Sequence, residues 1–329
     1  MRIALTRPLP GDFVLPDVPG AEVVTGPERG FPSREALHEF VRGASALVTW
    51  VSERVDGALL DAAGASGGDS GGGGLRVVNN FAVGYDNIDL DACRARGVVV
   101  CNTPDAVTDG TADVAVLLML AAARRLSAGD RYARSGAWAE GGVLGPRDFL
   151  GQPVSGRTLL IVGAGRIGYQ TALRMIGWGM RVLYVARSPK PEFEHPPLCA
   201  RRVELDEGLR EADFVTIHTP LTEETRHLID ARRLGLMKET AVLVNTARGP
   251  VVDEGALARA LREGRIFAAG LDVFEQEPKV HPELVGLENV VMLPHIGSGN
   301  WRGRAAMTAL CAENINRVLS GREARTRIA

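Results

Sequence analysis

The stretch from residue 158 to residue 176 reads TLLIVGAGRIGYQTALRMI and decides the fold. Its first five residues form an apolar run typical of a buried strand, and Arg166–Ile176 has the pattern of a helix. Between them, Gly163, Gly165 and Gly168 follow the spacing G-x-G-x-x-G. In a strand–loop–helix unit such glycines permit a tight turn, close approach of the backbone to a pyrophosphate, and close packing of helix on strand. The stretch therefore predicts a dinucleotide-binding unit; a purely structural glycine turn is the alternative.

The next predicted strand lacks the acid that usually accompanies such a loop. In RVLYVARSPKP (Arg181–Pro191) the strand ends in Ala186, Arg187 and Ser188, whereas an Asp or Glu roughly 20 residues after the glycines normally holds the ribose 2′-hydroxyl. A carboxylate would repel a 2′-phosphate, but the donor fork of Arg187, the hydroxyl of Ser188 and the nearby Lys190 suit one. We therefore predict that NADPH is preferred to NADH. The alternative is that Arg187 is a solvated surface residue and that the preference is weak.

Composition excludes several classes of function. The 329 residues are 45% hydrophobic and 24% charged, as in ordinary globular proteins, and the length suits two domains better than one. A net charge of −2 without a basic run argues against nucleic-acid binding. Four cysteines without a C-x-x-C, and no histidine pair at ligand spacing, argue against a disulfide framework or a metal site. Because the N-terminus lacks a signal pattern and the longest apolar run, Val114–Ala123, is too short to span a bilayer, we expect a cytoplasmic protein that does not enter a membrane.

Short apolar strands alternate with helical patterns along the chain, which is typical of parallel α/β units. The expected strands are Arg2–Thr6, Ala21–Val24, Ala46–Trp50, Leu75–Asn79, Val98–Cys101, Thr158–Val162, Val182–Val185, Phe214–His218, Ala241–Asn245, Ala268–Leu271 and Val290–Leu293. Further helices are expected at Ser33–Arg42, with Ser33 as N-cap, and at Arg302–Leu319. We predict two doubly wound parallel-sheet domains with a cleft between them. A flavodoxin-like substrate domain takes residues 1–102 and 296–329, and a Rossmann NAD(P)-binding domain takes residues 103–295.

Two segments raise expectations of their own. GASGGDSGGGG (Gly64–Gly74) is of low complexity, and its glycines cannot pack a core, so we expect a surface loop inserted into the fold and not a phosphate cradle. The helix expected at Thr111–Arg125 is apolar nearly all round. It must therefore be buried between layers or against a partner.

Three polar residues follow strands in the second half of the chain. Arg248 follows AVLVN, Glu277 follows FAAGLDVF, and His295 follows VVMLP. Because ligands of an open α/β sheet bind outside the carboxyl ends of the strands, the three could converge. A histidine there can protonate a carbonyl oxygen as hydride arrives, a neighbouring carboxylate orients it, and an arginine can bind a carboxylate. The residue types alone leave Glu277 open as a turn residue, Arg248 as a helix cap, and His218, after VTI, as a structural histidine.

The motifs in combination resemble the D-2-hydroxyacid dehydrogenase family, and within it the glyoxylate and hydroxypyruvate reductases. They are NNFAVGYDNIDLDACRARGVVVCNTPDAVTDGTADVA, GAGRIG, NTARGPVVDEGAL, AAGLDVFEQEP and LPHIGSG, and the resemblance covers essentially the full length. It implies that Arg248, Glu277 and His295 are the catalytic arginine, the partner glutamate and the acid/base histidine. Val83 and Gly84 match a loop whose N–H groups hold the substrate carboxylate, as a small anion nest does.

The resemblance also implies cofactor and partner contacts. The positions that match the family's cofactor site are Gly163, Ala164, Gly165, Arg166, Ile167, Gly168, Ala186, Arg187, Ser188, Pro220, Thr246, Ala247, Asp272, His295 and Gly297. Asp272 among them would lie toward the nicotinamide carboxamide. A homodimer is implied, with the helix at Thr111–Arg125 and the following arm as its interface. Trp138, in that arm, matches an aromatic residue that in some relatives reaches toward the partner's active site.

These matches predict an NADPH-dependent reductase that converts small 2-oxo acids, glyoxylate or hydroxypyruvate first, to D-2-hydroxy acids; NADH is the second cofactor. Phosphoglycerate, formate and phosphite dehydrogenases of the same fold are alternatives, and a non-catalytic dinucleotide-sensing protein is another. Glu277 stands where formate dehydrogenases typically have Gln, and the Val83 loop lacks the lysine of phosphite dehydrogenases. The chain departs from the family pattern at two places. The Gly-rich insertion falls in a surface connection, whereas Asn300 and Trp301, after the last motif, are expected to reshape the pocket wall and so bear on substrate size and not on the chemistry.

Overall fold

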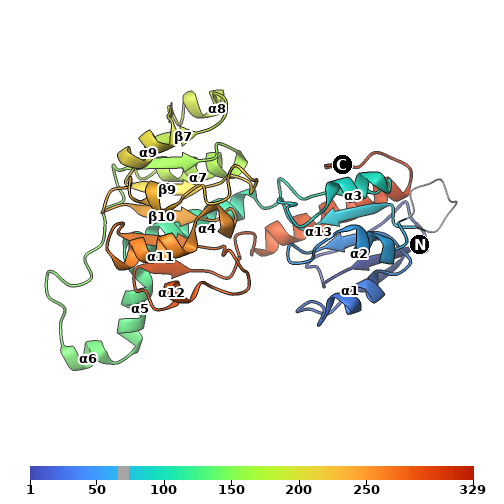
Figure 1. Ribbon diagram of the computed structural model, residues 1–329, viewed down its shortest axis with the longest axis horizontal. Helices are drawn as coiled ribbons and strands as arrows, with labels where there is room; N and C mark the ends of the chain where they lie inside the picture. Colours follow the sequence, from blue (N-terminus) through green and yellow to red (C-terminus); the bar gives the residue numbers. More distant parts are fainter. Residues whose placement is uncertain (66–73) are drawn as a thin grey trace. The chain divides into compact units, whose positions relative to one another are not determined.

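The computed structural model describes residues 1–65 and 74–329, which divide into two compact α/β units (Figure 1). The first unit combines Met1–Val107 with Ser298–Ala329, and the second is Thr108–Gly297. The boundaries expected from the sequence differ by five residues at the first junction (107 against 102) and by two at the second (297 against 295). Most of the expected Gly-rich loop, residues 66–73, lies outside the described residues.

The first unit is built on a parallel sheet in the order β2-β1-β3-β4-β5. Its strands are β1 (Arg2–Leu5), β2 (Glu22–Thr25), β3 (Ala44–Thr49), β4 (Val77–Asn80) and β5 (Val99–Cys101), and its helices are α1 (Arg34–Val41), α2 (Gly57–Ala62), α3 (Leu90–Ala95) and α13 (Trp301–Leu319). In β3, Leu47 packs on the side of α1 to α3, whereas Ala46 and Val48 belong to the core under α13. The tail of the chain therefore returns to the first domain, as predicted, and covers the second face of its sheet.

The second unit is a larger parallel sheet in the order β12-β11-β10-β9-β6-β7-β8. Its strands are β6 (Thr158–Val162), β7 (Arg181–Val185), β8 (Arg201–Arg202), β9 (Phe214–Ile217), β10 (Val242–Asn245), β11 (Ala268–Leu271) and β12 (Val290–Met292). Its helices are α4 (Thr108–Ala123), α5 (Leu126–Arg134), α6 (Ala137–Gly141), α7 (Arg166–Ile176), α8 (Pro191–Glu194), α9 (Leu205–Glu211), α10 (Ala231–Leu234), α11 (Glu254–Arg262), α12 (Pro282–Val285) and the 3-10 turn η1 (Gly249–Val251). Helices α4 and α7 share one buried core with the sheet, and α9 to α12 share the other. The prediction of two doubly wound parallel-sheet domains is thus confirmed.

Local signals in the sequence set several element boundaries. Ser33 caps α1 by accepting the N–H of Ala36 at 3.3 Å, as predicted. Helix α4 starts three residues earlier than the predicted helix, at Thr108, and ends two residues earlier, at Ala123. One side of α4 is buried against the sheet, but Leu117 on another side stays 51% exposed in the single chain. The expected burial between layers therefore holds for one side of α4 only.

The sequence named neither strand β8 nor the short helices in the arm after α4. The two-residue edge strand β8 pairs with β7, with Arg202 beside Tyr184. The short helices α5 and α6 follow α4 and extend away from the rest of this unit (Figure 1). Within residues 1–65 and 74–329, no helix has both the length and the apolar character that a membrane span requires.

Candidate active site

The predicted cofactor and catalytic residues of the second unit follow its parallel strands at their carboxyl ends. The glycine loop follows β6, Ala186 to Ser188 follow β7, Pro220 follows β9, Thr246 to Arg248 follow β10, Asp272 to Glu277 follow β11, and His295 follows β12. Because all the strand pairs of this sheet are parallel, these ends lie along one edge of it. In an open α/β sheet this is the edge at which ligands bind.

The glycine loop has the shape that a pyrophosphate needs. A Cβ added to Gly163, whose φ is +104°, would lie 2.7 Å from the carbonyl carbon of His218, and one on Gly168 would lie 2.5 Å from the oxygen of Gly163. Protein packing therefore requires these two glycines. A Cβ on Gly165 would meet nothing within 4 Å, and Gly165 is the N-cap of α7 without a side-chain cap. The space in front of Gly165 and the N-terminus of the helix fit the phosphates of a dinucleotide.

Two buried hydroxyls at the same edge lack a hydrogen-bond partner among the described residues. The Oγ1 atoms of Thr219, after β9, and Thr246, after β10, are inaccessible and make no hydrogen bond within the described part of the chain. Buried hydroxyls without a partner are costly, so each one favours a ligand that completes it. Thr246 is among the predicted cofactor residues. Thr219 was missed, because only the structure reveals its unsatisfied hydroxyl.

His218 is a structural histidine, which settles the alternative left open by the sequence. Its Nε2 atom lies 3.1 Å from Oγ1 of the buried Thr216. Burial lowers the pKa of His218 to about 3. The neutral ring packs beside the glycine loop, 3.5 Å from the position of a Cβ on Gly168. It therefore supports the loop and does not exchange protons near neutral pH.

His295 and Glu277 form a close pair. Nδ1 of His295 lies 2.7 Å from Oε2 of Glu277, and the two side chains are 29% and 33% exposed. The other carboxylate oxygen, Oε1, accepts the N–H of Phe274 at 3.0 Å. Burial alone would raise the pKa of Glu277, but the hydrogen bond and charge of His295, with the Phe274 N–H and the charge of Arg248, outweigh it and lower that pKa. The carboxylate stays ionised and orients the ring, while Nε2 of His295 has no partner among the described residues.

Asp272 binds the backbone of the two residues that follow His295 in the chain. Its two oxygens accept the N–H groups of Ile296 at 2.8 Å and Gly297 at 2.7 Å, and the residue is only 1% exposed. Burial raises the pKa of Asp272, and these two hydrogen bonds offset part of that rise. A Cβ on Gly297 would lie 3.0 Å from Oδ2 of Asp272, so the close approach needs glycine. The observed contacts of Asp272 position the His295 loop; its contact with a carboxamide stays a prediction.

Arg248 lies beside the glutamate. It is the N-cap residue of η1, where its side chain makes no capping hydrogen bond. Its Nη1 donates to the carbonyl oxygen of Ala247 at 2.8 Å, and its charge contributes to the lowered pKa of Glu277. A Cβ on the next residue, Gly249, would lie 1.9 Å from the carbonyl carbon of Phe274. The segments that carry Arg248 and Glu277 are therefore packed directly against each other.

Three predicted substrate-binding residues belong to other segments of the chain. Val83 and Gly84 belong to the first unit, in the loop after β4, where Asn102 Nδ2 donates to the Val83 oxygen at 2.8 Å and Asn80 Nδ2 donates to the Gly84 oxygen at 2.7 Å. Trp138 lies in α6 and is 51% exposed. The roles of these three in substrate binding stay predictions.

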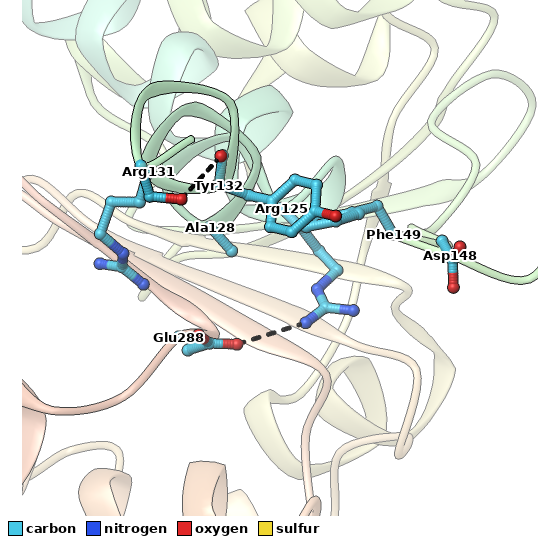
Figure 2. Close-up of a pocket in the computed structure, with 8 residues that line it drawn as sticks. Arg125, Ala128, Arg131, Tyr132, Asp148, Phe149 and Glu288 are labelled. Carbon is cyan, nitrogen blue, oxygen red and sulfur yellow. Dashed lines mark hydrogen bonds and ion pairs between the residues drawn. The ribbon is translucent and has the colours of Figure 1, made fainter. Parts of the chain in front are cut away.

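A pocket of about 400 Å³ lies away from the strand ends, beside α5. Figure 2 shows Arg125 reaching toward Glu288, with Nη2 and Oε2 3.8 Å apart, and Tyr132 and Phe149 close by. None of the predicted site residues lines this pocket. Among the described residues, no group of three His, Cys, Asp or Glu side chains could hold a metal ion.

Comparison with known proteins identifies the family. Residues 116–297 match the D-isomer specific 2-hydroxyacid dehydrogenase, NAD binding domain. A glyoxylate reductase of Thermococcus onnurineus is 49% identical over 95% of this chain and 91% of its own. A protein of Thermus thermophilus with a solved structure is 42% identical, with a TM-score of 0.90 and full coverage of both chains. An NADPH-dependent glyoxylate/hydroxypyruvate reductase of Sinorhizobium meliloti, solved with NADP and malonate, is 31% identical, with a TM-score of 0.80 over 100% of this chain and 96% of its own. The chain therefore belongs to the D-isomer specific 2-hydroxyacid dehydrogenases, glyoxylate reductase type, and is an NAD(P)-dependent oxidoreductase that acts on CH–OH groups.

Proposed function

We propose that the protein is an NADPH-preferring reductase that converts small 2-oxo acids, with glyoxylate and hydroxypyruvate first, to D-2-hydroxy acids. The observation that carries this proposal is the 2.7 Å contact between His295 Nδ1 and the ionised Glu277. It leaves Nε2 of His295 for a substrate, beside Arg248 and at the same sheet edge as the glycine loop. The names of the relatives support the substrate class.

His295 donates the proton of the reaction. When bound, the reduced nicotinamide supplies a hydride to the carbonyl carbon. Nε2 of His295 gives its proton to the carbonyl oxygen, so that C=O becomes CH–OH, and Glu277 stabilises the protonated ring that precedes the transfer. Arg248 binds the carboxylate of the 2-oxo acid and draws charge from the carbonyl oxygen. The N–H groups at Val83 and Gly84 are proposed to hold that carboxylate as well.

The preference for NADPH rests on the end of β7. Arg187 and Ser188 occupy the place of the usual acid, and both are exposed. Residues 186–188 include no Asp or Glu that would repel a 2′-phosphate, and the arginine fork and the hydroxyl can both bind one. The relative solved with NADP supports the same preference.

Steady-state kinetics with both cofactors test the proposal. Wild-type protein is assayed with glyoxylate, hydroxypyruvate, pyruvate and larger 2-oxo acids, with NADPH and with NADH. We expect kcat/KM to be highest with NADPH and either glyoxylate or hydroxypyruvate, and to fall for NADPH in Arg187→Asp. Arg210→Asp, which changes an exposed arginine of α9, is the matched control and should leave the values unchanged. Equal or NADH-favouring values would reject the cofactor preference, and no oxidation of NADPH with any 2-oxo acid would reject the reductase.

Two other functions remain distinct outcomes of these assays. Another dehydrogenase of this family, such as a phosphoglycerate dehydrogenase, would show its activity with a phosphorylated substrate and not with glyoxylate. A dinucleotide-sensing protein would bind NADPH without oxidising it, and His295→Ala would then change nothing. The Glu277–His295 contact favours the reductase over the binding protein, because binding alone needs no oriented acid.

A homodimer is proposed as the working assembly. Large apolar side chains are exposed on α4 and on the arm that contains α5 and α6: Leu117 at 51%, Leu126 at 54%, Trp138 at 51%, Val143 at 96% and Leu150 at 62%. Exposed apolar side chains gathered on one segment are typical of an interface. Light scattering at micromolar concentration should give twice the mass of the chain, and a monomer would reject the proposal.

A further inference from the structure

The loop at residues 186–190 would face the 2′-position of the cofactor. Its first two backbone carbonyl groups accept hydrogen bonds from Arg202. This arginine lies on β8, the edge strand that the sequence did not reveal, and is paired in register with Tyr184 of β7. Its Nε and Nη2 atoms donate to the oxygen of Ala186 at 3.1 and 3.0 Å, and Nη2 also donates to the oxygen of Arg187 at 3.1 Å. One guanidinium therefore binds two successive carbonyl groups.

The other end of the 186–190 loop is held by Tyr184. Its hydroxyl accepts the N–H of Lys190 at 2.9 Å and donates to Oε1 of Glu194 at 2.5 Å. The ring is fully buried and packs against Phe193, with the centroids 5.1 Å apart. The loop is thus fixed at both ends before any ligand arrives, which lowers the entropy that binding must overcome.

The two carbonyls that bind Arg202 determine where the N–H groups point. The peptide bonds that join Ala186, Arg187 and Ser188 are trans, and in a planar trans peptide the N–H lies opposite the C=O. The N–H groups of Arg187 and Ser188 are therefore turned away from Arg202. Neither has an acceptor within the described residues. Two successive N–H groups on one side of a turn form an anion-binding nest.

We propose that Arg202 is a positioning residue that selects the phosphorylated cofactor. It need not touch the 2′-phosphate: it turns two carbonyl dipoles away from that group and presents the N–H groups of Arg187 and Ser188 to it, next to their side chains. Without Arg202 these peptides can rotate and direct carbonyl oxygens at the phosphate, which would repel it. This inference rests on the proposed preference for NADPH and adds a determinant outside the 186–188 segment.

Calorimetry with two nucleotides tests the inference without turnover. Adenosine 2′,5′-bisphosphate carries the 2′-phosphate, and 5′-AMP lacks it. The variants are Arg202→Met, which removes both the fork and the charge, and Arg202→Lys, which keeps the charge but not the planar fork. Arg201→Met is the matched control, because Arg201 lies on the same strand but binds Glu207 at 2.7 Å and Glu211 at 2.5 Å.

The expected results separate positioning from charge. Arg202→Met should weaken binding of the bisphosphate about tenfold, and Arg202→Lys about threefold or more, as for loss of a charge-assisted contact at an exposed site. Binding of 5′-AMP should change less than about twofold in every variant, as should binding of either nucleotide by Arg201→Met. The inference is overturned if Arg202→Met binds the bisphosphate like wild type, if Arg202→Lys restores binding fully, if Arg201→Met weakens it as much, or if 5′-AMP weakens equally. A wild-type protein that does not distinguish the two nucleotides would overturn the proposed NADPH preference together with this inference.

Discussion

Substituting Gly165 separates what the fold needs from what the cofactor needs. The residue has φ −97° and ψ −169°, which alanine adopts freely, and a Cβ there would meet nothing within 4 Å. Alanine is a poorer N-cap than glycine by roughly 0.5–1 kcal/mol, but it also loses less entropy on folding, by about 0.4–1 kcal/mol. The two effects offset each other. We expect the stability of Gly165→Ala to lie within about 0.5 kcal/mol of wild type.

The same methyl group should strongly impair dinucleotide binding. We propose that the pyrophosphate approaches the backbone at the open space in front of Gly165, so that the Cβ would displace it from the N–H groups of α7. We expect a dissociation constant for NADPH at least about 100-fold higher, which corresponds to about 2.7 kcal/mol. Loss of these contacts should leave the melting temperature of the free protein unchanged.

Gly168→Ala is the matched control for this prediction. Its Cβ would lie 2.5 Å from the oxygen of Gly163 and 2.8 Å from Cγ2 of Ile161, an overlap that costs about 2 kcal/mol. That loss lowers the melting temperature of a unit of this size by about 4–8 °C. Calorimetric melting and fluorescence titration with NADPH measure both quantities. If Gly165→Ala binds NADPH like wild type, or melts as early as Gly168→Ala, the assignment of the open space to the pyrophosphate is wrong.

Three further substitutions test the site and its support. Glu277→Gln should lower kcat about 10- to 100-fold with the dissociation constant for NADPH within about twofold, because a neutral amide no longer stabilises a protonated imidazole; an unchanged kcat contradicts this. Asp206, whose pKa Arg232 holds at about 2 by a 2.6 Å contact, should stabilise the fold above about pH 4 relative to Asp206→Asn. The expected difference in unfolding free energy is about 1 kcal/mol at pH 7, because the Asp206 side chain is one-third exposed. Since the pKa of Asp206 is depressed in the folded state, urea unfolding should show this difference vanish as the pH falls through 2. A difference that persists at lower pH would refute the linkage. Glu254 is 4% exposed and exchanges hydrogen bonds with Glu275 at 2.7 and 2.9 Å. Glu254→Ala should therefore lower the free energy of unfolding by about 1–3 kcal/mol, as measured by thermal unfolding. An unchanged melting temperature would show that these hydrogen bonds do not stabilise the fold.

The glycine loop and the strand-end residues could be predicted because their signals are local. Spacing along the chain determines which glycines enter the turn, and α7 begins at the predicted Arg166. Apolar runs locate parallel strands, and the end of a strand locates a candidate such as His295. These rules bring residues to one edge of the sheet. They do not predict that His295 and Glu277 meet at 2.7 Å.

The missed features depend on contacts between segments far apart in the chain. The role of Asp272 in holding Ile296 and Gly297 joins two loops 24 and 25 residues apart, and no periodicity encodes it. Thr219 is notable only because its hydroxyl lacks a partner in the described structure. Strand β8, which carries Arg202, has two exposed arginines and no apolar pattern. Such residues have a recognisable role only after the sheet has brought their neighbours together.

The central claim is that His295 delivers the proton to the substrate carbonyl, and one measurement tests it directly. The turnover number for NADPH-dependent glyoxylate reduction is compared between wild type and His295→Gln, with the NADPH dissociation constant of each variant measured by titration. The account predicts a loss of about 10²- to 10⁴-fold in kcat with NADPH binding retained within about threefold. A variant that keeps kcat within about threefold of wild type would show that another group supplies the proton, and would contradict the account.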